Sequence, residues 1–249
     1  MNAVSTEQLT LAYPNGTIAL ADLSIDIRQG EIFGLLGLNG AGKTSLIKAI
    51  ATLLRPLAGR VHVLGMDTYS HAAEIKRRIG VVPQENNLDT RLNVRQNLLF
   101  PCRYAGLSSA LAEIRTARWL STLQLEDKGN ASVLGLSGGS KRKVMLAKAF
   151  LTEPELLILD EPSAGLDPGV RGMLWEYVRT FRRAGGTVLL STHYLEEAEQ
   201  LCDRIGILNR GTLVSTTAMA AWSGLSASGE RKLGELFRLA VGEGPCISP

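Results

Sequence analysis

The sequence predicts an α/β fold in which a parallel β-sheet forms the core, an antiparallel β subdomain precedes it, and an α-helical subdomain is inserted into it. Residues 7–13 alternate apolar and polar side chains and run into a turn, as in an antiparallel hairpin. The runs 32–36, 156–159 and 187–190 are short and mostly apolar, which is typical of strands buried on both faces. Residues 93–150 instead show helical periodicity without strand signals.

Length and composition are those of a globular protein with a sizeable core, since 45% of the 249 residues are hydrophobic and 20% are charged. The net charge of +3 comes from 27 basic and 24 acidic residues without a long block of either sign, which gives no support for nucleic-acid binding. Cys102, Cys202 and Cys246 show no CxxC spacing, so they indicate neither a zinc site nor a disulfide framework and favour a reducing cytoplasm. No window reaches the length of about 20 apolar residues that spans a bilayer, so we expect any membrane role to require a partner.

The N-terminal part is predicted to form strands. Residues 7–13 and 18–27 flank the turn Pro14-Asn15-Gly16, and residues 60–65 alternate as a further strand. Tyr13 ends the first strand, and two interpretations of it stay open. Its ring either packs in a core or stacks on a nucleotide base.

The stretch from 37 to 44 reads GLNGAGKT and matches the phosphate-binding pattern GxxxxGK[ST]. It lies between the apolar run 32–36 and the helix-compatible residues 45–50, which is the strand, loop and helix context that a P-loop NTPase requires. The glycines let backbone N–H groups approach phosphate oxygens at the positive end of the helix. Lys43 adds a charge at the outer phosphates, and the Thr44 hydroxyl is the expected Mg²⁺ ligand. The predicted nucleotide-binding residues of this loop are Gly37, Leu38, Asn39, Gly40, Ala41, Gly42, Lys43, Thr44 and Ser45.

Gln84 follows the predicted helix 72–78 and the short strand 79–83. Open α/β sheets bind ligands in the crevice beyond the carboxyl ends of their strands. A glutamine there can reach a metal or a water over the nucleotide, although a glutamine taken alone is usually only a loop residue.

A second glycine-rich loop, Leu136-Ser137-Gly138-Gly139-Ser140, precedes a predicted amphipathic helix at 141–151. A helix N-terminus of this kind can bind anionic oxygen. Taken alone, a Ser/Gly loop more often indicates an ordinary turn.

Polar residues follow two further predicted strands. Asp160 and Glu161 come directly after the run 156–159, and burying two neighbouring carboxylates for structure alone would be costly. We therefore expect Asp160 to hold Mg²⁺ through water and Glu161 to accept a proton from an attacking water. His193 closes the next apolar strand; a lone histidine is more often structural, but this is the third strand terminus in a row with a polar group.

The rest of the chain completes the core. Its predicted elements are helices at 169–183 and 194–202, strands at 204–208 and 212–214, and one helix around 231–241 in an otherwise Ser/Gly/Ala-rich tail.

In their order and spacing, the motifs GLNGAGKT, VVPQ, LSGGS, LLILDEP, SAGLD and STH resemble those of the ATP-binding subunit of an ABC transporter. The resemblance covers about residues 7–214. It implies an ABC ATPase domain over 1–214, with the helical subdomain at about 86–150, and a short tail over 215–249. Residues 81–107 are similar to the ATPases that serve drug, polysaccharide and nodulation-factor exporters.

The same resemblance implies activity and partners. The chain would bind ATP with Mg²⁺, hydrolyse it to ADP and phosphate, and power export through a separate integral-membrane permease. It would work as a dimer with a second ATPase subunit, most simply a copy of itself, at the cytoplasmic face of the membrane.

Roles for individual residues also follow from the resemblance. Tyr13 would stack on adenine, Gln84 would contact Mg²⁺ and water and sense the permease, and His193 would be the γ-phosphate switch. Asp167 would be the cross-dimer loop residue. The residues that would contact the γ-phosphate held by the other subunit are Ser137, Gly138 and Gly139.

The family's commonest residue at position 140 is glutamine, and this chain has Ser140. The phosphate-contacting Ser-Gly-Gly is intact, so we interpret the change as tolerated, with the efficiency of dimer closure left open.

Competing functions differ in sequence features. A soluble ABC ATPase of DNA repair or chromosome organisation would need a long coiled-coil or zinc insertion, and a translation-type ABC protein would carry two cassettes. A non-catalytic subunit would be expected to lack Lys43 or Glu161, and a P-loop kinase would not carry LSGGS. A soluble ABC-type ATPase with a non-transport partner is the alternative to an export ATPase.

The segment 85–100 links Gln84 to the helical subdomain, and we expect it to be the permease docking surface. Its apolar side chains offer contacts that a water-facing loop would not need. The alternative is that they merely pack the helical subdomain. The side chains concerned are Leu88, Leu92, Leu98 and Phe100.

Overall fold

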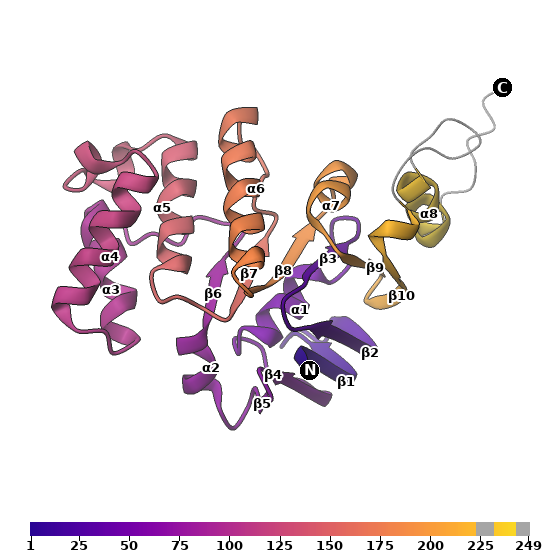
Figure 1. The fold of residues 1–249 in the computed structure, drawn as a ribbon. Helices are drawn as coiled ribbons and strands as arrows, with labels where there is room; N and C mark the ends of the chain where they lie inside the picture. Colours follow the sequence, from indigo (N-terminus) through magenta and orange to yellow (C-terminus); the bar gives the residue numbers. More distant parts are fainter. Residues whose placement is uncertain (223–231, 243–249) are drawn as a thin grey trace.

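The computed structural model describes residues 1–222 and 232–242 and contains a six-stranded sheet at its centre (Figure 1). The strand order is β10-β9-β3-β8-β7-β6, and all neighbours are parallel except β10, which pairs antiparallel with β9. The predicted parallel core is therefore confirmed. The strands are β3 (Ile32–Leu36), β6 (Ile79–Val82), β7 (Leu156–Asp160), β8 (Thr187–Thr192), β9 (Arg204–Asn209) and β10 (Thr212–Ala218).

A second, antiparallel sheet of four strands has the order β2-β1-β4-β5. The predicted N-terminal β subdomain is confirmed, although its first strand begins at Asn2, five residues before the predicted start. The strands are β1 (Asn2–Ala12), β2 (Ile18–Arg28), β4 (Ala58–Val63) and β5 (Met66–Asp67).

The helices surround the central sheet, with α3, α4 and α5 gathered at one end as the helical subdomain (Figure 1). Short 3-10 turns occur at Glu126–Lys128, Val133–Gly135 and Met219–Ala221. The helices are α1 (Lys43–Ile50), α2 (Ala72–Arg78), α3 (Val94–Tyr104), α4 (Ser109–Thr122), α5 (Gly138–Phe150), α6 (Pro168–Arg183), α7 (Leu195–Leu201) and α8 (Lys232–Val241).

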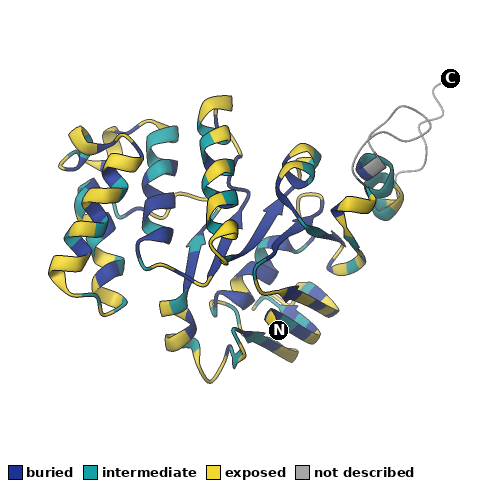
Figure 2. Ribbon diagram, viewed as in Figure 1, coloured by how far each residue is buried: buried dark blue, intermediate teal, exposed yellow. Residues whose placement is uncertain are grey.

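The buried strands β3 and β7 are almost entirely apolar, because their side chains pack into two hydrophobic cores, one on each face of the sheet. In β3, Ile32 and Leu36 pack toward α6, α7 and the helical subdomain, whereas Phe33 and Leu35 pack toward α1 and the β subdomain. Alternation of side chains along a strand produces this division. Figure 2 shows the result, with the central strands buried and the exposed residues on the outward faces of the helices.

Helix α5 and strand β10 are also longer than the sequence predicts. Helix α5 begins at Gly138, three residues before the predicted start, so both glycines of the second loop lie in its first turn. Strand β10 runs to Ala218, four residues past the predicted end. The division of the chain at residue 214 stays a prediction.

Helix α8 packs on the core, since Leu233 is fully buried and the Asn209 amide donates to the Ala240 carbonyl at 3.3 Å. Arg231, where this helix was predicted to begin, lies outside the described residues, as do the other residues of 223–231 and 243–249. Cys246 is among them, while Cys102 and Cys202 are buried and free.

The side chains of the segment 85–100 differ in burial, so some fit packing of the helical subdomain and others fit an exposed docking surface. Leu88 and Leu98 are 6% and 0% exposed and belong to the hydrophobic core, so they pack the helical subdomain. Phe100 is 66% exposed. None of the helices in the described part of the chain is long and apolar enough to cross a membrane.

Candidate functional site

The loop between β3 and α1 has the backbone that the glycine pattern predicts. Gly40 and Gly42 have φ values of +80° and +108°, which favour glycine. A Cβ at Gly42 would also lie only 2.8 Å from the Ala19 carbonyl oxygen. Helix α1 begins at Lys43 without a side-chain cap, so the N–H groups of its first turn can bind an anion.

A pocket of about 700 Å³ opens over this loop, which suits a ligand of nucleotide size. Tyr13, Gln84 and Glu161 line it together with residues 38–45, as the sequence predicts. The other lining residues, which sequence reasoning missed, are Thr17, Ile18, Ala19, Arg210 and Gly211.

Packing of the β9–β10 hairpin onto the P-loop and against β2 brings Arg210 and Gly211 to the pocket. The N–H of Gly211 donates to the Ala41 carbonyl at 2.9 Å, and the N–H of Ala21 donates to the Gly211 carbonyl at 3.0 Å. No sequence motif marks this contact, because it depends on where β9 joins the sheet.

Tyr13 stands at the wall of the pocket, and its hydroxyl lies 2.9 Å from the Ser45 hydroxyl. The ring is half-buried and belongs to neither hydrophobic core. Of the two interpretations, the core aromatic is therefore not supported, and Tyr13 lines the pocket.

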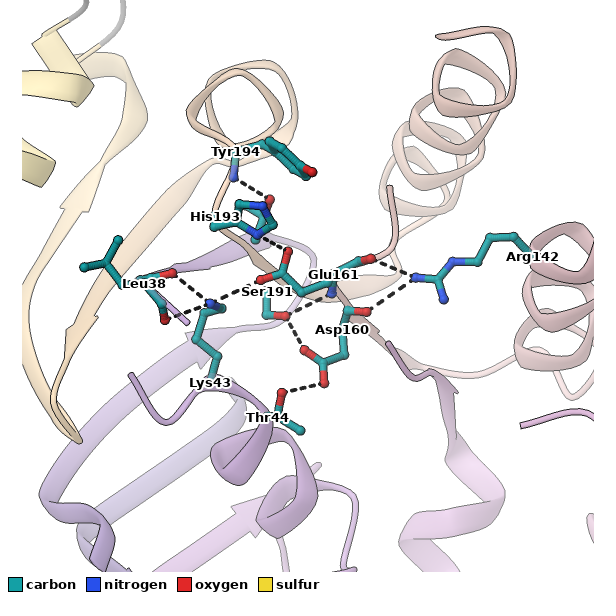
Figure 3. A network of polar contacts seen from close by, with 11 residues as sticks. Leu38, Lys43, Thr44, Arg142, Asp160, Glu161, Ser191, His193 and Tyr194 are labelled. Atoms are coloured by element: carbon teal, nitrogen blue, oxygen red, sulfur yellow. Dashed lines mark hydrogen bonds and ion pairs between the residues drawn. The ribbon is translucent and has the colours of Figure 1, made fainter. Parts of the chain in front are cut away.

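Asp160 lies at the end of β7, 2% exposed, and holds two hydroxyls (Figure 3). The Thr44 hydroxyl donates to Oδ2 at 2.9 Å, and the Ser191 hydroxyl donates to Oδ1 at 2.5 Å. A carboxylate beside a hydroxyl is an oxygen set that suits Mg²⁺. Among the described residues there is no group of three or more His, Cys, Asp and Glu that could form a different metal centre.

Glu161 is the centre of a second set of contacts (Figure 3). Its side chain is 5% exposed; Oε1 lies 3.1 Å from the Lys43 ammonium, and Oε2 lies 2.7 Å from His193 Nδ1. Oε1 is buried and forms no aligned hydrogen bond within the described residues, so the Lys43 ammonium is its nearest charged partner. The arrangement can hold a carboxylate over the phosphate-binding loop and orient it through an imidazole.

The backbone of Glu161 is strained, with φ at +48°, where a non-glycine residue is uncommon. Such strain costs on the order of 1 kcal/mol and persists where surrounding contacts enforce it. Here the Glu161 N–H donates to the Ser191 hydroxyl at 3.1 Å. Ser191 thus forms hydrogen bonds with both carboxylate residues. The sequence does not single it out, because it is one of several polar residues at the end of β8.

The predicted Ser-Gly-Gly loop does not reach this pocket in the same chain. Ser137 caps α5 by accepting the N–H of Ser140 at 3.2 Å, and its hydroxyl donates to the Ser140 hydroxyl at 3.0 Å. Asp167 caps α6 by accepting the N–H of Val170 at 3.0 Å, and Gly139 lies beside it. Residues 137–139 and 167 therefore form a separate polar surface.

Arg142 is a further residue of the site that sequence reasoning missed. It is buried in α5 and donates to the Glu161 carbonyl at the end of β7 (Figure 3). It also donates to the Pro83 carbonyl at the end of β6. In the sequence it is the middle residue of a short basic run, Lys141-Arg142-Lys143, which on its own indicates a solvated surface.

Comparison with known proteins gives consistent matches. Residues 20–164 match the ABC transporter protein family. The chain is 44% identical to Nod factor export ATP-binding protein I of Burkholderia orbicola over 196 residues, which cover 79% of this chain and 64% of that protein. The chain thus spans less than two thirds of the length of this relative.

Solved structures agree with this assignment. The structure of an ATP-binding subunit of an ABC transporter has a TM-score of 0.86 and 32% identity, covering 96% of this chain and 99% of the other. A dimeric ATP-binding cassette in a post-hydrolysis state with ADP and phosphate has a TM-score of 0.81 and 25% identity, covering 87% and 98%. The chain therefore belongs to the ABC transporter family and carries its ATP-binding domain.

Proposed function

We propose that this chain is the ATP-binding and ATP-hydrolysing subunit of an ABC exporter and that it powers a separate membrane permease. The observation that carries the proposal is one pocket lined by the P-loop, Gln84 and Glu161. Directly behind its lining, Asp160 contacts Thr44 and His193 contacts Glu161. The export-protein relative and the cassette that carries ADP and phosphate support it.

The nucleotide would lie along the 700 Å³ pocket. Tyr13 would stack on the base, and its bond to Ser45 would fix the ring relative to the phosphate loop. The first-turn N–H groups of α1 and the Lys43 ammonium would bind the phosphates, because both present positive charge to an anion.

Thr44 and Asp160 would hold Mg²⁺, with Gln84 at the same pocket as a further oxygen ligand. Bound Mg²⁺ would neutralise part of the phosphate charge. The Ser191 hydroxyl fixes Oδ1 of Asp160, so the carboxylate is already oriented to hold Mg²⁺.

Hydrolysis requires that the attacking water lose a proton, and Glu161 is the proposed acceptor. Its Oε1 forms no hydrogen bond among the described residues, and its Oε2 is fixed by His193. Lys43 would stabilise the negative charge that develops on the phosphate oxygens.

A head-to-tail dimer would complete the site. Residues 137–139 and 167 are expected to face phosphate, yet they lie away from the pocket of their own chain. A second copy, or a related cassette, would bring its Ser-Gly-Gly loop over the P-loop nucleotide. The dimeric cassette of similar fold supports this arrangement.

The permease would dock on the segment 85–100 at the cytoplasmic face of the membrane. Since Leu88 and Leu98 are buried, the proposal rests on the side chains of α3 that stay exposed. Phe100 and Tyr104 are 66% and 60% exposed and one helical turn apart, so they form an apolar stripe.

The function can be tested with variants that carry one added cysteine in a Cys246→Ser background, because the remaining Cys102 and Cys202 are buried. In membranes that hold the assembled transporter, Phe100→Cys should cross-link to the membrane permease, and Leu57→Cys, which is 69% exposed, should not. Phosphate release with MgATP is measured on the same preparations. Cross-links from Leu57→Cys only would overturn the docking surface, and stimulation of the ATPase by a soluble partner alone would favour the non-transport alternative.

A further inference from the structure

Arg142 is 7% exposed and spans from α5 to the ends of two central strands. Its Nη1 donates to the Pro83 carbonyl at 2.7 Å, directly before Gln84. Its Nε donates to the Pro162 carbonyl at 2.8 Å, and its Nη2 donates to the Glu161 carbonyl at 3.0 Å. A single side chain of the helical subdomain therefore holds the backbone beside the proposed metal contact and beside the proposed base.

Burying this charge is unfavourable in itself. Desolvation lowers the pKa of Arg142, and only the charges of Asp160 and Glu197 raise it. The described residues contain no carboxylate in ion-pair contact with the guanidinium, so backbone carbonyl dipoles provide its near partners. A buried charge with this cost is a weak choice for stability alone.

The guanidinium is suited to holding two strand ends together because its donors form a rigid planar fork. The fork satisfies carbonyls that come from β6 and β7 at the same time, whereas a lysine ammonium is a single point charge on a flexible stem. A change in the direction of α5 would therefore act on the backbone of Glu161 through these hydrogen bonds.

We propose that Arg142 is a positioning residue, which couples the placement of α5 and its Ser-Gly-Gly loop to Glu161 and Gln84. This inference rests on the proposed ATPase function. Arg142 touches neither the pocket nor the P-loop, so its effect on the reaction would pass through the two strand ends. The coupling would make hydrolysis depend on how the helical subdomain is seated.

The expected result is a loss of kcat without a loss of ATP affinity. Displacing a reacting group by about 1 Å can cost on the order of 100-fold in rate. Arg142→Lys and Arg142→Gln should therefore lower kcat by about 10-fold to 100-fold, with the lysine variant less affected because it keeps one charged donor. The Kd for MgATP should stay within about 2-fold of wild type, since Arg142 forms no hydrogen bond with the P-loop or with Tyr13, which would bind the phosphates and the base.

Arg115→Ala is a matched control on α4. Arg115 donates to the Leu151 carbonyl at 2.9 Å and pairs with Glu153 at 2.6 Å, so its loss also removes an arginine–carbonyl bond from the helical subdomain. It contacts no strand end that carries a proposed site residue. We expect this variant to lower the unfolding midpoint and to leave kcat near wild type.

ATP binding, steady-state kcat and the unfolding midpoint are measured on each sample. Wild-type kcat in both Arg142 variants would overturn the inference, as would an equal loss of kcat in Arg115→Ala or a parallel loss of ATP affinity. If Arg142→Gln does not fold, Arg142→Lys carries the same test, because it keeps a buried cation of similar size. Failure of the wild-type chain to bind or hydrolyse ATP would instead overturn the proposed function.

Discussion

Lys43 and Glu161 form a buried ion pair, with 3.1 Å between the ammonium and Oε1 and side-chain exposures of 6% and 5%. The cation of the P-loop and the carboxylate at the end of β7 are therefore already in contact. Oε1 forms no aligned hydrogen bond, while the ammonium donates to the Gly37 carbonyl at 2.7 Å. Each charge neutralises the other, so replacing one leaves the other buried and uncompensated.

Lys43→Ala should raise the Kd for MgATP by about 10-fold or more, because a charge-assisted hydrogen bond contributes about 1.5–3 kcal/mol. It should also lower the unfolding midpoint, since Glu161 loses its counter-ion. Isothermal titration and thermal unfolding check the two effects. Lys76→Ala, on the exposed face of α2, is the control, and wild-type affinity in Lys43→Ala would refute the phosphate-binding role of Lys43.

Ser137→Arg should abolish turnover and leave ATP binding intact, because Ser137 does not line the pocket of its own chain. The added side chain would obstruct the surface that meets the other subunit's nucleotide. Phosphate release and ATP titration separate the two properties, with Ser109→Arg on the exposed start of α4 as control. A wild-type chain that stays fully active as a monomer at high dilution contradicts the shared site.

His193→Ala should reduce turnover with ATP still bound. His193 Nδ1 lies 2.7 Å from Glu161 Oε2, so the substitution frees the carboxylate to rotate away from the attacking water. Single-turnover hydrolysis is the appropriate measurement, and His62→Ala in β4 controls for histidine loss. An unchanged rate in His193→Ala would mean that the contact does not orient the base.

Glu197→Gln should stabilise the fold at high pH more than at low pH. Desolvation raises the pKa of Glu197, which is 1% exposed and accepts the Trp175 Nε1–H at 3.2 Å. The folded state therefore holds this proton more tightly than the unfolded state, and stability falls as pH rises from about 4.3 through the raised pKa. The glutamine variant cannot lose a proton and keeps the acceptor for Trp175.

Urea unfolding at pH 5 and pH 8 measures the effect of Glu197→Gln, with Glu196→Gln, an exposed neighbour on α7, as control. The gain in the free energy of unfolding should be larger at pH 8 than at pH 5, because the wild-type carboxyl must lose its proton in a buried site at the higher pH. A larger gain at pH 5 than at pH 8 would contradict the assigned direction.

Much of the fold and the pocket could be predicted because local patterns determine them. Apolar strands that end in Gln84 and Glu161 lie in one parallel sheet, and the carboxyl ends of such strands share an edge. The residues were therefore expected near the P-loop, and they line one pocket with Tyr13.

The features that the sequence did not predict depend on contacts between elements that lie far apart in the chain. Which residue of Lys141-Arg142-Lys143 points inward is decided by how α5 packs against β6 and β7, and no local pattern gives that orientation. The burial of Leu98 and the exposure of Phe100 are likewise settled by the packing of the helical subdomain. Arg210 reaches the pocket only because the β9–β10 hairpin lies on the P-loop.

The hydrolysis rate of Glu161→Gln tests the central claim most directly. The substitution keeps size and shape but removes the charge that accepts the proton, so hydrolysis should fall by a factor on the order of 10²–10⁴. ATP affinity should stay near wild type, and the variant should accumulate as an ATP-bound dimer, because binding and closure precede proton transfer. Hydrolysis by Glu161→Gln at the wild-type rate would show that Glu161 is not the base and would contradict the mechanism.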